Sequence, residues 1–277
     1  MFQTTRDSRG RAGSALVLAE VTYHAAVRSV RKTHGNALLA IALNIMQAVI
    51  FVAVFYFMFA LLGLRGASLR GDFLLYIMSG VFLFLTHTKT LGAVAGAEGP
   101  TSPMMQHAPM NTAVSILAAM LSTLYIQTLS LFTILFVYDV VLNPGVVMEI
   151  MDPIAAFGMF LLAWFTGAAL GMVFMAAKPW APVPVGIITT LYQRANMIAS
   201  GKMFVANTLT PQLLAMFDWN PLFHCIDQAR GHMFVNYFPR NSSVEYPIWV
   251  AVVFLMLGLM GEFYTRKHAS ASWGAKR

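Results

Sequence analysis

Six apolar stretches, each near or above the length that crosses a bilayer, restrict what this chain can fold into. A transmembrane α-helix needs about 20 mainly apolar residues. Hydrophobic residues make up 58% of the 277 positions and charged residues 10%, whereas a soluble domain carries roughly 25% charged residues. We therefore expect a bilayer around the molecule. The long continuous runs favour helices over the short alternating strands of a β-barrel.

The expected architecture is an all-α integral membrane protein in which residues 1–277 form a single transmembrane domain. The six spans are expected at residues 36–62, 73–95, 112–138, 154–177, 183–205 and 246–264. The first run begins near Ala37, which is too far along the chain for a cleavable signal peptide, so we expect it to be retained. The one cysteine, Cys225, excludes a disulfide within the chain and a multi-cysteine metal site.

Residues 15–32 have the pattern of an amphipathic helix that lies in the cytoplasmic interface of the membrane. Their apolar positions recur every three or four residues, and basic positions fall on the other side of the helix. The apolar positions are Leu16, Ala19, Tyr23, Val27 and Val30, and the opposite ones are His24, Arg28, Arg31 and Lys32.

The net charge of +7 is concentrated near the two ends of the chain. With six spans, twelve Lys and Arg residues are assigned to the inside and five to the outside, counting Lys89 at the inner edge of the second span and Lys202 at the outer end of the fifth. Because Lys and Arg mark the cytoplasmic side, we expect both termini there. Basic ends also suit nucleic acid, but in a chain this apolar they favour topology and anionic lipid attraction, so no nucleic-acid partner is expected.

Between the last two long apolar runs, residues 200–237 are too polar to cross a bilayer and too apolar for a solvated loop. Pro211 and the Asn220-Pro221 pair interrupt this segment, so it is expected to form short helices that enter the membrane surface, turn and return. Trp219 would anchor the turn at the level of the lipid headgroups.

Three ionisable residues follow this turn at three-residue spacing, namely His224, Asp227 and Arg230. On a helix, Asp227 can pair with either neighbour. Such a pair has two interpretations, a functional part of the outer segment or an ion pair that only stabilises its surface.

Several polar side chains interrupt the predicted spans. Lys89 lies near the inner edge of the second span, Gln193, Arg194 and Asn196 lie within the fifth, and Lys202 lies near its end. A lone cation in lipid costs at least about 2.5–3.5 kcal/mol, so these groups should face protein or water. They either line a polar path or snorkel and pair between helices. We favour snorkelling or pairing for Lys89 and a path for the group around Arg194.

The chain lacks the motifs of a self-sufficient enzyme or pump. It has no Walker A motif, no His-Glu-x-x-His, no Gly-x-Ser-x-Gly and no pair of carboxylates within one span, and its seven histidines are scattered. We therefore expect a non-enzymatic transport domain that binds no cofactor or metal and is driven by a separate engine. An intramembrane enzyme acting on lipid carriers is the less favoured alternative.

The outer segment also has a recognisable motif. Ser200-Gly201 is followed by Leu209 and Pro211, and then by Trp219-Asn220-Pro221-Leu222-x-His224-x-Ile226-Asp227-x-x-Arg230. The chain also has a basic interfacial helix, then six spans, then a short basic tail. With this order and this motif, the chain resembles the ABC-2-type permeases of bacterial capsular polysaccharide and O-antigen exporters. The resemblance in layout covers nearly the whole chain and is motif-specific over about residues 199–238. Asp227 stands where glutamate is commoner.

This resemblance implies a homodimer in the bacterial inner membrane that passes a lipid-linked polysaccharide outward. Two copies of a separate ATPase subunit would use ATP inside, and periplasmic or outer-membrane export components would complete the route. Residues 206–238 would be the outer gate, and the loop at 96–111 would contact the ATPase. The coupling residues it implies are Glu98, Pro103, Gln106, His107 and Pro109.

The chain departs from the family in its fifth span, which is usually apolar in family members. Here it carries Gln193, Arg194, Asn196 and Lys202, which favours an anionic polymer or a helix buried against its partner. A permease for another cargo, such as a drug or a lipid, is the alternative function.

Overall fold

The computed structural model describes residues 11–32, 36–61, 63, 72–102, 111–142 and 150–268, and within these ranges every regular element is a helix. The long helices are α1 (Arg11–Lys32), α2 (Ala37–Leu61), α3 (Phe73–Ala95), α4 (Thr112–Val137), α5 (Pro153–Ala177), α6 (Pro182–Ala199) and α9 (Glu245–His268). The short ones are the π-helix η2 (Tyr138–Leu142), the 3₁₀ helix η3 (Ala206–Thr208), α7 (Pro211–Leu214) and α8 (Pro221–Met233).

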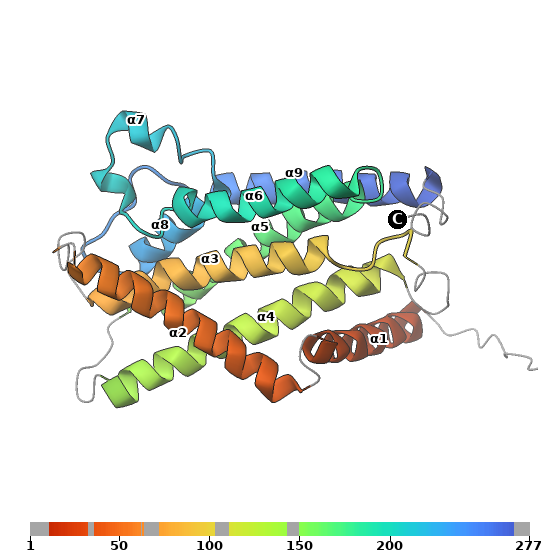
Figure 1. The fold of residues 1–277 in the computed structure, drawn as a ribbon, viewed down its shortest axis with the longest axis horizontal. Helices are drawn as coiled ribbons and strands as arrows, with labels where there is room; N and C mark the ends of the chain where they lie inside the picture. The colour runs from red at the N-terminus through yellow and green to blue at the C-terminus, as the bar shows by residue number, and fades with distance from the viewer. Residues whose placement is uncertain are drawn as a thin grey trace, which may run out of the picture.

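Four long helices, α3, α5, α6 and α9, run along the long axis of the molecule, and α2 and α4 cross it obliquely (Figure 1). The helices α7 and α8 lie at one end of this bundle. The other end holds α1, residues 96–102 after α3 and the last turns of α9. The segment between α6 and α9 and the basic last turns of α9 thus lie at opposite ends of the bundle.

The helix α3 forms the centre of the bundle and is buried on nearly all sides. Its tightest neighbour is α5, where Gly167 packs directly on the backbone of His87 and a Cβ would collide with the His87 carbonyl oxygen. On the other side of α5, Gly258 of α9 approaches Met172 so closely that an added Cβ would lie 2.7 Å from the Met172 Cβ. Small residues at such crossings let helices within a membrane approach closely.

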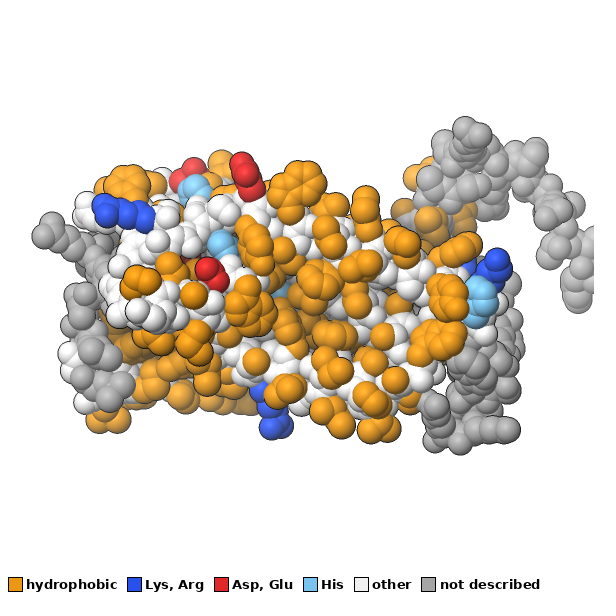
Figure 2. Space-filling model, turned by 90° about the horizontal axis from the view of Figure 1, so that it is seen from above, with side chains coloured by type: hydrophobic (Ala, Val, Ile, Leu, Met, Phe, Trp, Pro, Cys, Tyr) orange, Lys and Arg blue, Asp and Glu red, His pale blue; other side chains and the backbone are white. Residues whose placement is uncertain are grey.

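Five helices among the described residues are long and apolar enough to cross a membrane: α2, α3, α4, α5 and α9. Their surfaces carry many exposed large apolar side chains, including Phe57, Phe136 and Met260. The face in Figure 2 is mostly hydrophobic over its middle, and most of its charged side chains lie towards the two ends. This distribution is that of a protein surrounded by lipid.

The predicted bounds of the first four spans agree with α2, α3, α4 and α5 to within one residue, and the last span lies inside α9. The predicted amphipathic helix at 15–32 corresponds to α1, which begins four residues earlier, at Arg11.

The predicted fifth span, at 183–205, is wrong in its extent. Helix α6 ends at Ala199 after 18 residues, and it is not among the five helices that are long and apolar enough to cross. The chain leaves the helix because Gly201 takes a positive φ of 74°, a conformation that ends helices. The polar residues Gln193, Arg194 and Asn196 lower the hydropathy of α6 itself.

Candidate functional site

The segment between α6 and α9 is anchored to α6 by two buried asparagines. Asn220 Nδ2 donates to Asn196 Oδ1 and to the Ala199 carbonyl oxygen, both at 2.8 Å. Asn220 Oδ1 accepts from the Leu222 backbone N–H at 3.0 Å, so the same side chain caps α8. Pro221 stands at the first position of α8, where its missing N–H costs no helical bond. The Trp-Asn-Pro motif is therefore a helix start joined to the end of α6.

Arg230 of α8 is the main polar contact between the outer segment and α3. It is 1% exposed, and its guanidinium donates to the carbonyl oxygens of Gly201 at 2.9 Å, Phe204 at 2.7 Å and Lys202 at 2.7 Å. It also donates to Ser79 Oγ at 3.4 Å and lies over the Tyr76 ring. These acceptors compensate the desolvation of a buried cation. Arg230 therefore fixes the conformation of the turn after α6 by binding three of its carbonyl oxygens.

Lys202 lies in that turn and points towards α3 and α2. Its side chain is 3% exposed, and Nζ is 3.5 Å from the centroid of the Phe84 ring and 5.2 Å from that of Phe55. Nζ has no hydrogen-bond partner among the described residues, so the two aromatic faces are its polar environment. The backbone of Lys202 approaches Gly80 so closely that a Cβ there would lie 2.9 Å from the Lys202 Cα.

The expected pairing of Asp227 with His224 or Arg230 is wrong. The Asp227 carboxylate instead accepts from the Tyr237 hydroxyl, and from Ser242 Oγ at 2.7 Å. Burial raises the pKa of Tyr237, and the nearby Asp227 charge raises it further, so the phenol stays protonated as the donor. Arg230 points away to its carbonyl acceptors. The spacing along the helix allows Asp227 to reach its charged neighbours, but its carboxylate is bound by Tyr237 and Ser242, which lie outside α8.

His224 joins the end of the α7 turn to the segment that enters α9. The Ser243 backbone N–H donates to Nδ1 at 3.0 Å, so Nδ1 is an acceptor and the proton of the neutral ring is on Nε2. Nε2 then donates to the Asp218 carbonyl oxygen at 2.6 Å. Burial lowers the pKa of His224, against the opposing effects of the Asp218 carbonyl and the Asp227 charge.

Pro211 and Trp219 lie at the edge of the molecule. Pro211 begins the single-turn helix α7. Trp219 is 56% exposed, its Nε1 donates to the Met216 carbonyl oxygen at 2.7 Å, and its own carbonyl accepts from the Tyr246 hydroxyl at 2.6 Å. With the exposed Met216 beside it, Trp219 presents an apolar surface and an internally satisfied N–H, which suits an interfacial position.

The five residues predicted to line a polar path are not brought together within one chain. Gln193 Nε2 donates to the Thr88 carbonyl oxygen at 3.0 Å, so it faces α3, and Asn196 faces α8. Lys202 faces the rings of Phe55 on α2 and Phe84 on α3. Arg194 is exposed on α6 and makes no hydrogen bond or ion pair to another described residue.

Lys89, the fifth of them, belongs to a polar cluster between α2, α3 and α4. Its Nζ donates to Asn44 Oδ1, which also accepts from Gln127 Nε2 at 3.0 Å, and Asn44 Nδ2 donates to Ser130 Oγ at 2.7 Å. This arrangement is the pairing between helices that the sequence favoured for Lys89.

A second buried group of contacts is centred on His87. The sequence places His87 inside the second predicted span, but it did not indicate which residues His87 contacts. His87 Nδ1 lies 3.0 Å from Thr166 Oγ1 and 3.2 Å from the Ala163 carbonyl oxygen, and Nε2 lies 3.1 Å from the Tyr192 hydroxyl. His87 therefore links α3 to both α5 and α6. A polar residue within an apolar helix was the signal, but its partners lie 76 to 105 residues away.

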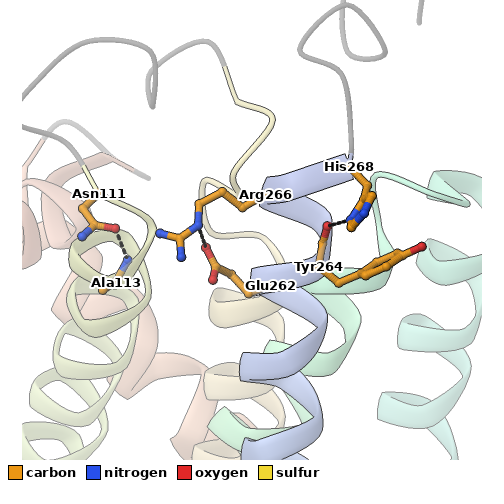
Figure 3. A network of polar contacts seen from close by, with 6 residues as sticks. All are labelled: Asn111, Ala113, Glu262, Tyr264, Arg266 and His268. Atoms are coloured by element: carbon orange, nitrogen blue, oxygen red, sulfur yellow. Dashed lines mark hydrogen bonds and ion pairs between the residues drawn. The ribbon is translucent and has the colours of Figure 1, made fainter.

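Of the predicted coupling residues, Glu98 lies in the described part of the chain, and Pro103, Gln106, His107 and Pro109 lie outside it. The Glu98 backbone N–H donates to Ser115 Oγ at 3.0 Å, and its carboxylate accepts from Ser102. Figure 3 shows the polar contacts at this same end, where Arg266 Nε lies 4.0 Å from Glu262 Oε1 and His268 Nδ1 lies 3.0 Å from the Tyr264 carbonyl oxygen. Asn111 caps α4 in the same view.

The fold and these contacts define a multi-pass, all-helical membrane protein with a polar, helix-containing segment folded back on one end. No protein-family model matches the sequence. The chain is similar to two Escherichia coli proteins named polysialic acid transport protein KpsM, with 23% identity over 203 residues and 24% over 207. Each alignment covers 72% of this chain and 75% of the relative. The resemblance to permeases of capsular polysaccharide exporters is thereby confirmed.

Proposed function

We propose that this protein is the transmembrane subunit of an ATP-driven exporter that moves a lipid-linked polysaccharide across the inner membrane, powered by a separate ATPase subunit. The observation that carries the proposal is the similarity to polysialic acid transport proteins over nearly three quarters of the chain. The five helices able to cross a membrane support it.

The exposed side of α6 supports an arrangement in which two copies face each other. Val183, Ile187, Leu191, Arg194 and Ile198 are spaced by four, four, three and four residues, so they form one stripe along the helix, and all are exposed. An arginine within an apolar stripe is expensive in lipid and suits a protein or water surface. The stripe and its counterpart in a second copy would line the path.

Arg194 would then be the residue of this path that meets the cargo. Its guanidinium is free of partners among the described residues, and a guanidinium binds carboxylate and phosphate groups through two parallel hydrogen bonds. The cargo that fits is an acidic glycan. Gln193 and Asn196 would hold α6 in place, since both side chains bond to other elements.

The outer gate is proposed to be α7 and α8 with the turns that flank them. The opposite end, with Glu98 and the 96–111 loop, would contact the ATPase inside the cell, where both termini would lie. Closure of two ATPase subunits on ATP would shift this end and change how α6 and the gate pack against α9 and the second copy, a bistable transition biased by nucleotide.

Two measurements test the proposal. Co-expression with a candidate ATPase should give a stable complex, and its ATP turnover in vesicles should rise when an acidic glycolipid is added. A clean deletion should abolish the surface polysaccharide and leave a lipid-linked glycan in the cytoplasm. A normal surface glycan in that strain would refute the proposed cargo, and accumulation of a drug or simple lipid would assign another. Turnover of a lipid carrier by the chain without ATPase or ATP would indicate an enzyme.

A further inference from the structure

An apolar groove of about 540 Å³ opens between α4 and α5 at the end of the bundle that carries α8. In Figure 1, α4 crosses the bundle obliquely. Buried side chains of α3 and α8, including Phe82 and Ala229, form its floor, and exposed side chains, Phe136 of α4 and Ile154 of α5, stand at its rim.

The lining of the groove suits hydrocarbon and not water. Ser79 is the one uncharged polar side chain that lines it, and its hydroxyl already donates to the Tyr76 carbonyl oxygen at 2.7 Å and accepts from Arg230. Water in an apolar cavity lacks the two to four partners that hold buried water in place. Pockets of about 300–1,000 Å³ commonly bury a small organic ligand. The rim belongs to two helices able to cross a membrane, so lipid chains reach the opening.

A single charge at the groove indicates which lipid fits. Asp139 is its one charged lining residue, at the point where α4 passes into η2. The carboxylate makes no hydrogen bond or ion pair to another described residue. A negative group at the end of an apolar groove is complementary to a headgroup with a primary ammonium and repels an anionic headgroup.

We propose that this groove is a binding site for a zwitterionic phospholipid of the surrounding bilayer, with one acyl chain between α4 and α5 and the ammonium of its headgroup on Asp139. The bound chain would support the gate helix directly. Ala229 lies in the floor, and the next residue, Arg230, makes the contacts that hold the turn after α6. This site is separate from the stripe on α6 and does not depend on the proposed cargo.

The test uses the full chain reconstituted in vesicles of equal phosphatidylethanolamine and phosphatidylglycerol, without glycolipid, followed by native mass spectrometry in mild detergent. We expect one phosphatidylethanolamine per chain to be retained, in at least fivefold excess over phosphatidylglycerol. Asp139→Asn should keep a retained lipid and lose the preference between headgroups. Retention of neither lipid, or preference for phosphatidylglycerol in the unaltered protein, would overturn the assignment. So would a lipid that is retained only when a lipid-linked glycan is added.

A matched pair on α5 locates the lipid. Ala156 lines the groove and Ala155, its neighbour, does not. Ala156→Phe should lower retention at least fivefold, and Ala155→Phe should leave it unchanged; equal retention in both would place the lipid elsewhere. A phosphatidylethanolamine with a photoreactive acyl chain tests the unaltered protein in case the larger side chain prevents folding. Its labels should fall on α4, α5 and α8. Labels confined to other helices, or crosslinks between two chains across this face, would contradict the proposal.

Discussion

Asn220 and Asn196 are joined side chain to side chain at 2.8 Å, and this contact fixes where α8 begins relative to the end of α6. Both side chains are almost completely buried. The Asn220 side chain makes three hydrogen bonds, one of them as the cap of α8.

Replacing Asn220 with alanine should destabilise the protein by about 2–3 kcal/mol, combining the loss of a cap with unsatisfied buried groups. Asn111 is the control, because it caps α4 through one exposed hydrogen bond of 3.2 Å. Asn111→Ala should cost about 1 kcal/mol or less. Thermal unfolding in detergent measures both, and equal effects would show that the contact with α6 adds nothing.

Arg230→Lys should be strongly destabilising although it keeps the charge. An ammonium on a flexible stem cannot reach three carbonyl oxygens and Ser79 at once, so acceptors would be left buried and unpaired. We expect a loss of about 3 kcal/mol, measured by thermal unfolding. Arg240→Lys at an exposed position should change stability by less than about 0.5 kcal/mol. A mild effect at Arg230 would mean that its carbonyl contacts are replaceable.

The packing of α3 on α5 predicts a contrast between two glycines on the same helix. A Cβ at Gly167 would collide with the His87 carbonyl oxygen, whereas one at Gly158 would meet nothing within 4 Å. Gly167→Ala should cost about 1–3 kcal/mol through overpacking. Gly158→Ala should be neutral or stabilising by up to about 1 kcal/mol, since alanine favours helix. Thermal unfolding of the two variants side by side distinguishes the predictions.

Acid should weaken the fold through His224. Its folded-state pKa lies below the ordinary value of 6.5, because protonation would charge a buried ring and remove the Nδ1 acceptor from Ser243. Above pH 6.5 the ring is neutral in both states and its contribution is complete. As the pH falls from 6.5 through the lower folded-state pKa, the unfolded state binds the proton more readily and stability declines.

His224→Gln should reduce this acid sensitivity, because glutamine can donate and accept without titrating. The exposed His24→Gln variant should keep the acid sensitivity of the unaltered protein. Unfolding temperatures between pH 5 and 8 provide the comparison, and parallel curves for all three proteins would exclude His224 as the source.

Arg194 provides the functional prediction. Arg194→Gln should lower export of an acidic glycan at least tenfold, which corresponds to about 1.4 kcal/mol, with little change in unfolding temperature. Arg194→Lys should restore part of the export, since the charge remains. Lys89→Gln, which removes a contact between helices, should instead lower stability. Undiminished export by Arg194→Gln would remove this residue from the path.

Sequence reasoning located the long helices well because apolar run length reports burial in lipid directly. Phe73–Ala95 was predicted to the residue. Sequence reasoning failed at the end of α6. There the boundary depends on the positive φ of Gly201 and on its contact with Arg230, 29 residues away. The Trp-Asn-Pro motif was recognised without the reason for its asparagine, which became clear only when Asn196 was found beside it.

The candidate site was less predictable, because its contacts join residues far apart in the chain. Helical spacing suggested that Asp227 pairs with His224 or Arg230, yet Tyr237 and Ser242 bind the carboxylate. The groove between α4 and α5 left no signal in the sequence. Its lining comes from five helices, α3, α4, η2, α5 and α8, which extend over residues 73–233 of the sequence.

The contacts of Arg230 determine how the end of the molecule that carries α8 can move. Separating α8 from the turn after α6 would strand a guanidinium and three carbonyl oxygens in an apolar interior, at a cost no ordinary thermal fluctuation covers. The same turn holds Lys202 against Phe84 of α3. The end of α6, the turn and α8 therefore travel with α3 as one rigid block. Any movement there must occur at the margins of that block, such as its contact with α9, and not by bending at Gly201.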